Sequence, residues 1–310
     1  MIKLFEQIGE FLNGSHPRPL LAIIGPTASG KTALSLKLAK KFNGEIISAD
    51  SRQIYKFMDI GTDKILPPSK QGITHHMLDL VDPDEEFTLA DFKRLALKTI
   101  DEIYRRHKLP ILVGGTGLYF NAIIDNYDIP RVPPNHELRA QLAQYHEQNG
   151  TEALHQMLAE RDPQTAKAIH PHNVRYVIRA LEINLAGNML KTDRKAEPQF
   201  NVFTIGIDWP REILYGRINR RVDLQIEKGL VNEVKTLLAQ GYNEKLPAMS
   251  SLGYPEIIAY IQGKCTLEAA SYTIKKNTRN YCKRQLTWFR RNRSIHWIDG
   301  PELEKFCADS

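Results

Sequence analysis

Short apolar runs alternate with amphipathic stretches over the first 125 residues of the chain. Residues 19–24 are apolar and lead into a glycine-rich loop, after which apolar side chains recur at helical spacing up to Phe42. Two more short apolar runs, 45–49 and 110–113, also end in polar or glycine-rich segments. Strands that alternate with helices in this way predict a parallel sheet in an α/β domain.

Two helices are expected beside these strands. Thr88 and Asp91 have the spacing of a capping box, which predicts a helix from 89 to about 106. The first twelve residues carry apolar side chains at helical spacing, which predicts a short helix packed on the core. Those apolar positions are Ile2, Phe5, Ile8 and Leu12.

The pattern changes near residue 127, where prolines interrupt the chain and helical periodicity follows without a strand. Helices are expected over 137–148, 151–160 and 174–185. A polar stretch, 188–198, then precedes an apolar run at 201–207 that predicts a return strand. We therefore expect an N-terminal extension at 1–17, a core at 18–127 and 199–310, and a small all-helical insertion domain at 128–198.

The composition is that of a globular protein, since 42% of the 310 residues are hydrophobic and 25% are charged. It excludes a disordered chain and a disulfide-stapled miniprotein. No run approaches 18 uninterrupted apolar residues, so no membrane association is expected. Three widely spaced cysteines without CxxC pairing predict reduced thiols in a cytoplasmic protein.

The net charge of +6 is concentrated near the C-terminus. Residues 275–293 contain eight basic side chains and no acid, and Lys276, Lys283 and Arg290 recur every seven positions with aromatic residues between them. Basic residues follow a phosphate backbone and aromatic planes stack on unpaired bases, which favours an RNA partner. A surface helix whose aromatic side chains face the core is an equal alternative.

A phosphate-binding motif follows the first strand. The residues Gly25, Pro26, Thr27, Ala28, Ser29, Gly30, Lys31 and Thr32 match G-x-x-x-x-G-K-[ST]. In such a loop, backbone N–H groups and the helix N-terminus bind phosphate, Lys31 neutralises charge and the Thr32 hydroxyl can ligate Mg²⁺. The motif predicts a site for a pyrophosphate-like group without identifying the ligand.

Asp50 is the best candidate acid, because it follows the second strand at the edge where an α/β sheet builds its ligand crevice. A carboxylate there could hold Mg²⁺ or accept a proton from a nucleophile, and a helix N-cap is the alternative. No acid follows the strand at 111–113, unlike in most nucleotide hydrolases. Instead, glycines surround Thr116, either to approach a ligand or to make a plain turn.

Further charged residues permit weaker interpretations. Four arginines follow the return strand: Arg211, Arg217, Arg220 and Arg221. One or two of these planar side chains could close over a phosphate, or they could be ordinary surface residues. His75 and His76 are adjacent, so in a strand they point to opposite faces and a metal site is not expected.

Seven segments resemble one family, the tRNA dimethylallyltransferases. They are residues 25–32, 47–64, 75–92, 113–120, 178–183, 251–256 and 283–290, in order within about 18–300. The resemblance implies a P-loop NTPase-like core, with a parallel sheet flanked by helices and a helical insertion domain. Since the Cys/His finger of eukaryotic members is absent, it also implies a bacterial type.

This resemblance implies a reaction and its ligands. A dimethylallyl group would pass from dimethylallyl diphosphate to N6 of the adenosine 3′-adjacent to the anticodon of tRNA, with Mg²⁺ as cofactor and a monomeric enzyme. By position, Asp50 is implied as general base, Thr116 as a polar group near the adenosine, and Lys31 as a diphosphate ligand. The implied tRNA contacts are Asp50, Ser51, Arg52, Gln53, Arg175, Arg179, Ser250, Ser251, Leu252, Gly253, Tyr254, Pro255, Lys283, Arg284, Gln285, Thr287, Trp288 and Arg290.

Two other functions are consistent with parts of the sequence. A small-molecule or nucleoside kinase would use the same loop for ATP, but the missing acid after residue 113 weighs against it. A non-catalytic RNA-binding protein would use the basic segment, but it would leave the phosphate loop unexplained.

Overall fold

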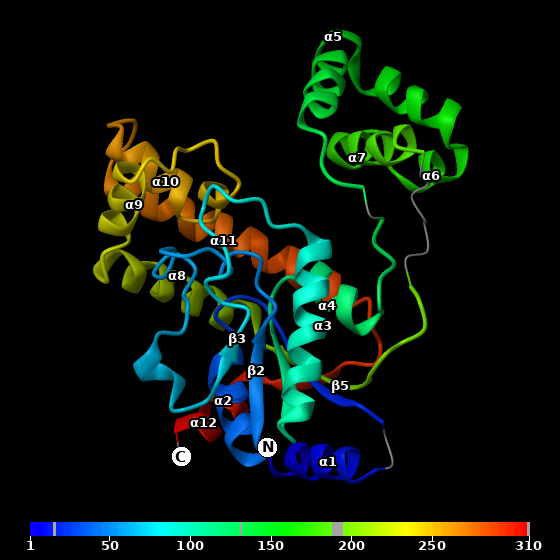
Figure 1. Ribbon diagram of the computed structural model, residues 1–310. Coiled ribbons are helices and arrows are strands. Elements are labelled where there is room, and N and C mark those ends of the chain that lie inside the picture. The colour runs from blue at the N-terminus through cyan, green and yellow to red at the C-terminus, as the bar shows by residue number, and fades with distance from the viewer. Residues whose placement is uncertain (15–16, 131, 188–194, 309–310) are drawn as a thin grey trace. The chain divides into compact units, whose positions relative to one another are not determined.

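The computed structural model describes residues 1–14, 17–130, 132–187 and 195–308 (Figure 1). Its sheet contains six parallel strands in the order β3-β2-β4-β1-β5-β6, which confirms the predicted α/β class. The strands are β1 Pro19–Ile24, β2 Gly44–Ser48, β3 His75–His76, β4 Leu109–Gly114, β5 Asn201–Asp208 and β6 His296–Asp299. The chain divides into two compact units, one of Met1–Ile124 with Pro198–Ser310, the other of Asp125–Glu197.

The first unit surrounds the sheet with helices (Figure 1). They are α1 Ile2–Asn13, α2 Lys31–Lys41, α3 Leu89–Arg105, α4 Gly117–Ile124, α8 Arg211–Glu227, α9 Leu230–Ala239, α10 Tyr254–Ile261, α11 Leu267–Phe289 and α12 Gly300–Ala308, with 3₁₀ turns at Pro67–Lys70 and Ala248–Ser250. The predicted capping box is present: Thr88 Oγ1 accepts from the Asp91 N–H and Asp91 accepts from the Thr88 N–H.

Alternate residues of each strand face opposite layers of the core. On one face, Leu21 and Ile23 of β1 belong to a cluster with residues of α1, α2, α8 and α12. On the other face, Leu20 and Ala22 pack with α3, α4 and Phe289 at the end of α11. Both faces of the sheet are therefore covered, and its ligand sites are confined to the strand ends.

The N-terminal helix packs on this core through three of its four predicted positions, since Ile8 is buried and Phe5 and Leu12 pack against the same cluster. Leu4 and Ile8 are buried, whereas Ile2 is 77% exposed, so the prediction that Ile2 belongs to the packed face is wrong. Phe5 lies 5.4 Å from Phe306, ring centre to ring centre, so α1 also packs against α12 and the two ends of the chain meet (Figure 1).

A third cluster lies beyond the sheet and unites α8, α9, α10 and α11. Residues Ile54, Tyr55 and Met58 from the segment after β2 are buried in it, with Tyr254 at the start of α10. This cluster fixes the long segment between β2 and β3, which carries several of the expected site residues.

The second unit, Asp125–Glu197, contains helices and has its own hydrophobic core. The sequence predicted an insertion domain with slightly different bounds, 128–198. Its helices are α5 His136–Arg161, α6 Pro163–Ala168 and α7 Val174–Leu185. The helices expected at 137–148 and 151–160 form α5, which is interrupted at Gly150 by a φ of +85°. Part of the predicted polar stretch, 188–194, lies outside the described residues.

Candidate active site

Three strand ends converge on one pocket of about 560 Å³. Residues 27–32 of the phosphate loop after β1, Asp50 after β2, and Gly114 with Gly115 at the end of β4 line this pocket. Gly25 and Pro26 do not line it, but their carbonyl oxygens accept from Lys31. Parallel strands bring their carboxyl ends to a single edge, which is why segments far apart in the sequence meet here.

Lys31 is the first residue of α2 and lies inside the phosphate loop. Its Nζ donates to the carbonyl oxygens of Gly25 at 3.0 Å and Pro26 at 2.6 Å. Burial lowers the pKa of Lys31 to about 8, and the nearby Arg221 adds to this effect while Asp50 opposes it. A bound anion would supply the negative charge that this ammonium lacks.

Two arginines of α8 contact the phosphate loop and line the pocket. Arg217 Nε donates to the Ala28 carbonyl at 3.0 Å, and its guanidinium also pairs with Glu304. Arg221 Nη1 donates to Thr27 Oγ1 at 2.7 Å. Of the four arginines selected from the sequence, Arg220 also lines the pocket, whereas Arg211 donates to the Tyr215 hydroxyl.

The same face of α8 contributes more residues than the sequence analysis selected. Its pocket-lining residues are Arg217, Arg220, Arg221, Leu224 and Gln225, and Lys228, which follows the end of the helix, also lines the pocket. Their spacing of three and four is the signal that could have identified them, since such positions share one helix face. By contrast, Asp63, Tyr281 and Glu304 also line the pocket, and no local pattern indicates them.

Gln285 of α11 joins the phosphate loop to the end of β4. Its Oε1 accepts from the Thr27 N–H at 3.0 Å, and its Nε2 donates to the Gly115 carbonyl at 2.9 Å. A Cβ at Gly115 would lie 2.2 Å from this amide, and one at Gly117 would lie 2.3 Å from the Trp288 ring. These two glycines are therefore required by the close approach of α11.

Asp50 lines the pocket, and its Oδ1 accepts from the Arg52 N–H at 2.8 Å. Thr116 lies beside Asp50 but does not line the pocket. Its Oγ1 accepts from the Ser51 N–H at 3.1 Å, and its side chain is hydrogen-bonded to Tyr281. Burial raises the pKa of Tyr281 to about 12, with a further contribution from the charge of Asp50. The geometry thus gives Thr116 a supporting contact and leaves the carboxylate of Asp50 facing the ligand space.

The donor set of the pocket fits a hard cation held together with an anion. Thr32 and the carboxylates of Asp50 and Asp63 supply oxygen atoms to the lining, and Ser29 Oγ is buried without a hydrogen-bond partner among the described residues. Within the described residues, three or more His, Cys, Asp or Glu side chains nowhere form a metal cluster. Mg²⁺ is commonly bound in this way, by few protein oxygens, phosphate and water.

The residues expected to contact tRNA near the pocket divide into exposed and buried groups. Lys283, Arg284, Thr287, Trp288, Arg290, Ser250 and Pro255 are exposed, and Asp50, Ser51, Arg52, Gln53 and Leu252 are half-buried. Ser251, Gly253, Tyr254 and Gln285 are buried. The side chains of Ser251, Tyr254 and Gln285 pack within the protein, and the tRNA contacts expected of this group stay predictions.

The basic segment has one buried face and one exposed face. Ile274, Cys282 and Phe289 bury one face of α11, while Lys283 and Arg284 are exposed on another. Some of the positive charge is compensated, since Lys275 pairs with Asp223 at 2.5 Å and Arg290 with Asp208 at 3.2 Å.

Arg175 and Arg179 belong to the second unit. Arg175 is exposed, whereas Arg179 pairs with the buried Glu182 and donates to the Val132 carbonyl at 2.8 Å. Burial alone would raise the pKa of Glu182, but hydrogen bonds from Arg139, the Asn135 N–H and Arg179 lower it to about 2. Arg179 therefore stabilises its own unit.

The histidine pair and the cysteines singled out in the sequence lie outside the pocket lining. His76 Nε2 lies 2.6 Å from Glu45, and His75 Nδ1 lies 2.9 Å from the Ile73 carbonyl. All three cysteines are free thiols. Across the part of the chain that the structure describes, every helix is too short or too polar to cross a membrane.

Comparisons with known proteins agree with this geometry. The family model described as IPP transferase matches residues 53–292. A tRNA dimethylallyltransferase of Acetivibrio thermocellus is 50% identical, covering 92% of this chain and 93% of its own, and one of Carboxydothermus hydrogenoformans is 47% identical, covering 92% and 94%. The crystal structure of a tRNA isopentenylpyrophosphate transferase from Bacillus halodurans is 43% identical with a TM-score of 0.69, covering 94% and 96%. A eukaryotic dimethylallyltransferase acting on tRNA is 28% identical with a TM-score of 0.78, covering 94% and 76%.

Proposed function

The chain belongs to the IPP transferase family, and we propose that it transfers a dimethylallyl group from dimethylallyl diphosphate to N6 of the adenosine 3′-adjacent to the anticodon of tRNA. The products are N6-isopentenyladenosine and diphosphate. A kinase is not favoured, because the relatives that match nearly the whole chain are named as tRNA-prenylating enzymes.

The observation that carries the proposal is one pocket that holds both a phosphate loop and a carboxylate. Lys31, Arg217 and Arg221 supply positive charge to the lining, and Asp50 follows β2, which β4 separates from the strand that leads into the phosphate loop. This arrangement suits an anionic leaving group beside a nucleophile that must lose a proton.

The chemistry follows from these positions. The lone pair of the adenine amine is delocalised, so the amine needs a hydrogen-bond acceptor as it attacks the allylic carbon. The new C–N bond forms while the C–O bond to diphosphate breaks, and Asp50 takes the proton that the amine loses. Lys31, the arginines and the backbone N–H groups of the phosphate loop stabilise the negative charge of the departing diphosphate.

Mg²⁺ would be held by the Thr32 hydroxyl together with diphosphate oxygens and water. It would supply positive charge to the leaving group. This assignment is supported by the oxygen donors of the pocket and by the sequence of the phosphate loop.

The RNA substrate would be an anticodon stem-loop, bound by a monomer. Lys283, Arg284 and Trp288 are exposed on α11, which also supplies Gln285 to the pocket. Phosphate contacts by the basic residues and stacking on the indole suit a single-stranded loop. Extruding a base costs on the order of a few kcal/mol, and this free energy is lowest for an unpaired base such as an adenosine in a loop.

One experiment separates this function from the alternatives. The protein is incubated with an anticodon stem-loop and Mg²⁺, with either dimethylallyl diphosphate or ATP, and the RNA is then weighed by mass spectrometry. We expect a gain of one isopentenyl unit with the prenyl donor alone. A phosphorylated product with ATP would support a kinase, and unchanged RNA with both donors would contradict the proposal.

A further inference from the structure

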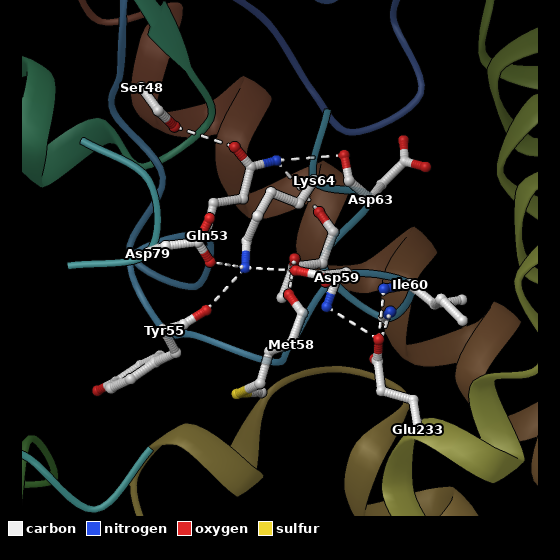
Figure 2. A network of polar contacts seen from close by, with 12 residues as sticks. Ser48, Gln53, Tyr55, Met58, Asp59, Ile60, Asp63, Lys64, Asp79 and Glu233 are labelled. Atoms are coloured by element: carbon white, nitrogen blue, oxygen red, sulfur yellow. Dashed lines mark hydrogen bonds and ion pairs between the residues drawn. The ribbon is translucent and has the colours of Figure 1, made fainter. Parts of the chain in front are cut away.

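Glu233, on the first turn of α9, accepts four hydrogen bonds. Its Oε2 accepts from the N–H groups of Asp59 at 2.9 Å and Ile60 at 2.7 Å, and its Oε1 accepts from the Gly61 N–H at 3.0 Å (Figure 2). The same Oε1 accepts from the Tyr254 hydroxyl at 2.7 Å. One carboxylate thus joins two segments that are far apart in the sequence.

The first of these segments is the 58–64 loop, which forms part of the pocket wall. Thr62 and Asp63 line the pocket, and Asp63 pairs with Arg221 at 3.3 Å. Gln53 Nε2 donates to the carbonyl of Thr62 at 3.2 Å, which connects the loop with the segment that follows Asp50. Displacement of this loop would therefore displace groups on the diphosphate side of the site.

Lys64 closes the other end of the 58–64 loop. Its Nζ donates to the Tyr55 carbonyl at 2.8 Å, to Asp59 at 2.7 Å and to Asp79 at 2.6 Å (Figure 2). Its side chain is 2% exposed, so this ammonium is fully desolvated and satisfied by three oxygens. Lys64 thus connects the loop to Tyr55 and Asp79, and Glu233 connects it to α9.

The second segment is 250–255, which precedes and begins α10. Tyr254 is fully buried there, and its ring packs so closely that a Cβ at Gly61 would lie 2.5 Å from it. Burial and the adjacent Glu233 carboxylate raise the pKa of Tyr254, so at neutral pH its hydroxyl is protonated and donates to Glu233. Arg52 also reaches this region, donating to the Pro247 carbonyl at 2.8 Å.

We propose that Glu233 is a positioning residue, whose carboxylate holds the 58–64 loop and the 250–255 segment in one geometry. The inference rests on the proposed function, in which these segments belong to the donor side and the RNA side of one reaction. Each ligand can bind to its own segment without Glu233, but the two reacting centres meet correctly only when the segments keep their relative position. Glu233 therefore contributes to turnover and hardly to affinity.

The test compares Glu233→Gln with Tyr254→Phe and with Glu227→Gln, a matched change at an exposed acid that ends α8. The glutamine keeps the size but replaces one acceptor oxygen by a donor, and the phenylalanine removes only one hydroxyl. At a temperature where all variants are folded, we expect kcat of Glu233→Gln to fall about tenfold, with Kd for the stem-loop and for pyrophosphate within about threefold of wild type. The kcat of Tyr254→Phe should also fall, but by less than tenfold, and the kcat of Glu227→Gln should match that of wild type.

Amide hydrogen exchange gives a readout that does not depend on turnover. In Glu233→Gln, exchange should accelerate in peptides covering 59–61 and also in those covering 250–256, whereas Glu227→Gln should change neither. Unaltered exchange at 250–256, or a wild-type kcat in folded Glu233→Gln, overturns the role of Glu233. An inactive wild-type chain instead overturns the proposed function.

Discussion

Asp50 is the residue on which the proposed chemistry depends most. Asp50→Asn keeps the size of the side chain and an oxygen for the Arg52 N–H, but removes the base. We expect prenyl transfer to fall about 10²–10⁴-fold, the usual contribution of a general base, while RNA binding is retained. Single-turnover mass spectrometry and filter binding measure the two effects, with the exposed Asp84→Asn as control. Near-normal turnover of Asp50→Asn would show that Asp50 is not the general base.

Lys31 predicts a pH dependence for ligand binding. Because burial lowers its pKa to about 8, the free protein loses this positive charge as the pH rises through that value. A bound anion favours the charged lysine, so the affinity for pyrophosphate should weaken between pH 7 and 9. In Lys31→Arg the guanidinium stays protonated, so its affinity should weaken less. Calorimetric titrations of both proteins check this, and equal slopes would contradict it.

At the scale of elements, the contact between α4 and α11 depends on a missing side chain. A Cβ at Gly117 would meet the Trp288 ring at 2.3 Å, whereas one at Gly216, within α8, would meet nothing within 4 Å. We expect Gly117→Ala to lower the free energy of unfolding by about 1–3 kcal/mol, as overpacking does. Gly216→Ala should raise it by about 0.4–1 kcal/mol. Urea unfolding measures the free energy of unfolding of both variants. Equal effects would show that α11 can shift to accommodate the added methyl group at little cost.

The exposed face of α11 makes a separate prediction. Lys283→Ala should weaken binding of the stem-loop and reduce the salt dependence of log Kd by about 0.7–0.9 for one lost phosphate contact. Lys264→Ala, also exposed but in the loop before α11, serves as the control. A change in unfolding temperature with an unchanged salt slope would make Lys283 a structural residue.

Local periodicity was sufficient for the elements that carry strong patterns. The capping box at Thr88 and the apolar strands were predictable because their signals lie within a few residues. The strand β6 was not predicted, since it has four residues at the edge of the sheet and only partly buried side chains. Ile2 was misassigned because several faces of a short helix can look apolar, and tertiary packing selects Leu4 and Ile8.

At the scale of the whole molecule, the hydrophobic core of the larger unit and that of the Asp125–Glu197 unit have no residue in common. Three clusters belong to the larger unit, and the fourth is formed entirely within Asp125–Glu197. We expect calorimetry to resolve two unfolding transitions, because each core can be lost alone. Pyrophosphate at about 100 times its Kd should stabilise only the transition of the larger unit, by about 2.7 kcal/mol. A single transition with equal calorimetric and van't Hoff enthalpies would contradict this.

The site shows where sequence reasoning reaches its limit. The phosphate loop and Asp50 could be selected because strand ends of a parallel sheet share one edge. Glu304 and Tyr281 enter the pocket from helices that follow much later, and no local spacing indicates that approach. Tyr254 was assigned to RNA by position, but the third hydrophobic cluster buries it, and that cluster exists only once four helices have packed.

Helix α11 presents charge outward at Lys283 and Arg284 and sends Gln285 inward to the phosphate loop. Consecutive positions of one helix therefore serve two purposes, and substitutions at the first can accumulate without disturbing the second. Under the proposed function, substitutions on this surface would change RNA preference and leave the donor pocket behind it intact, in natural divergence and in engineering alike.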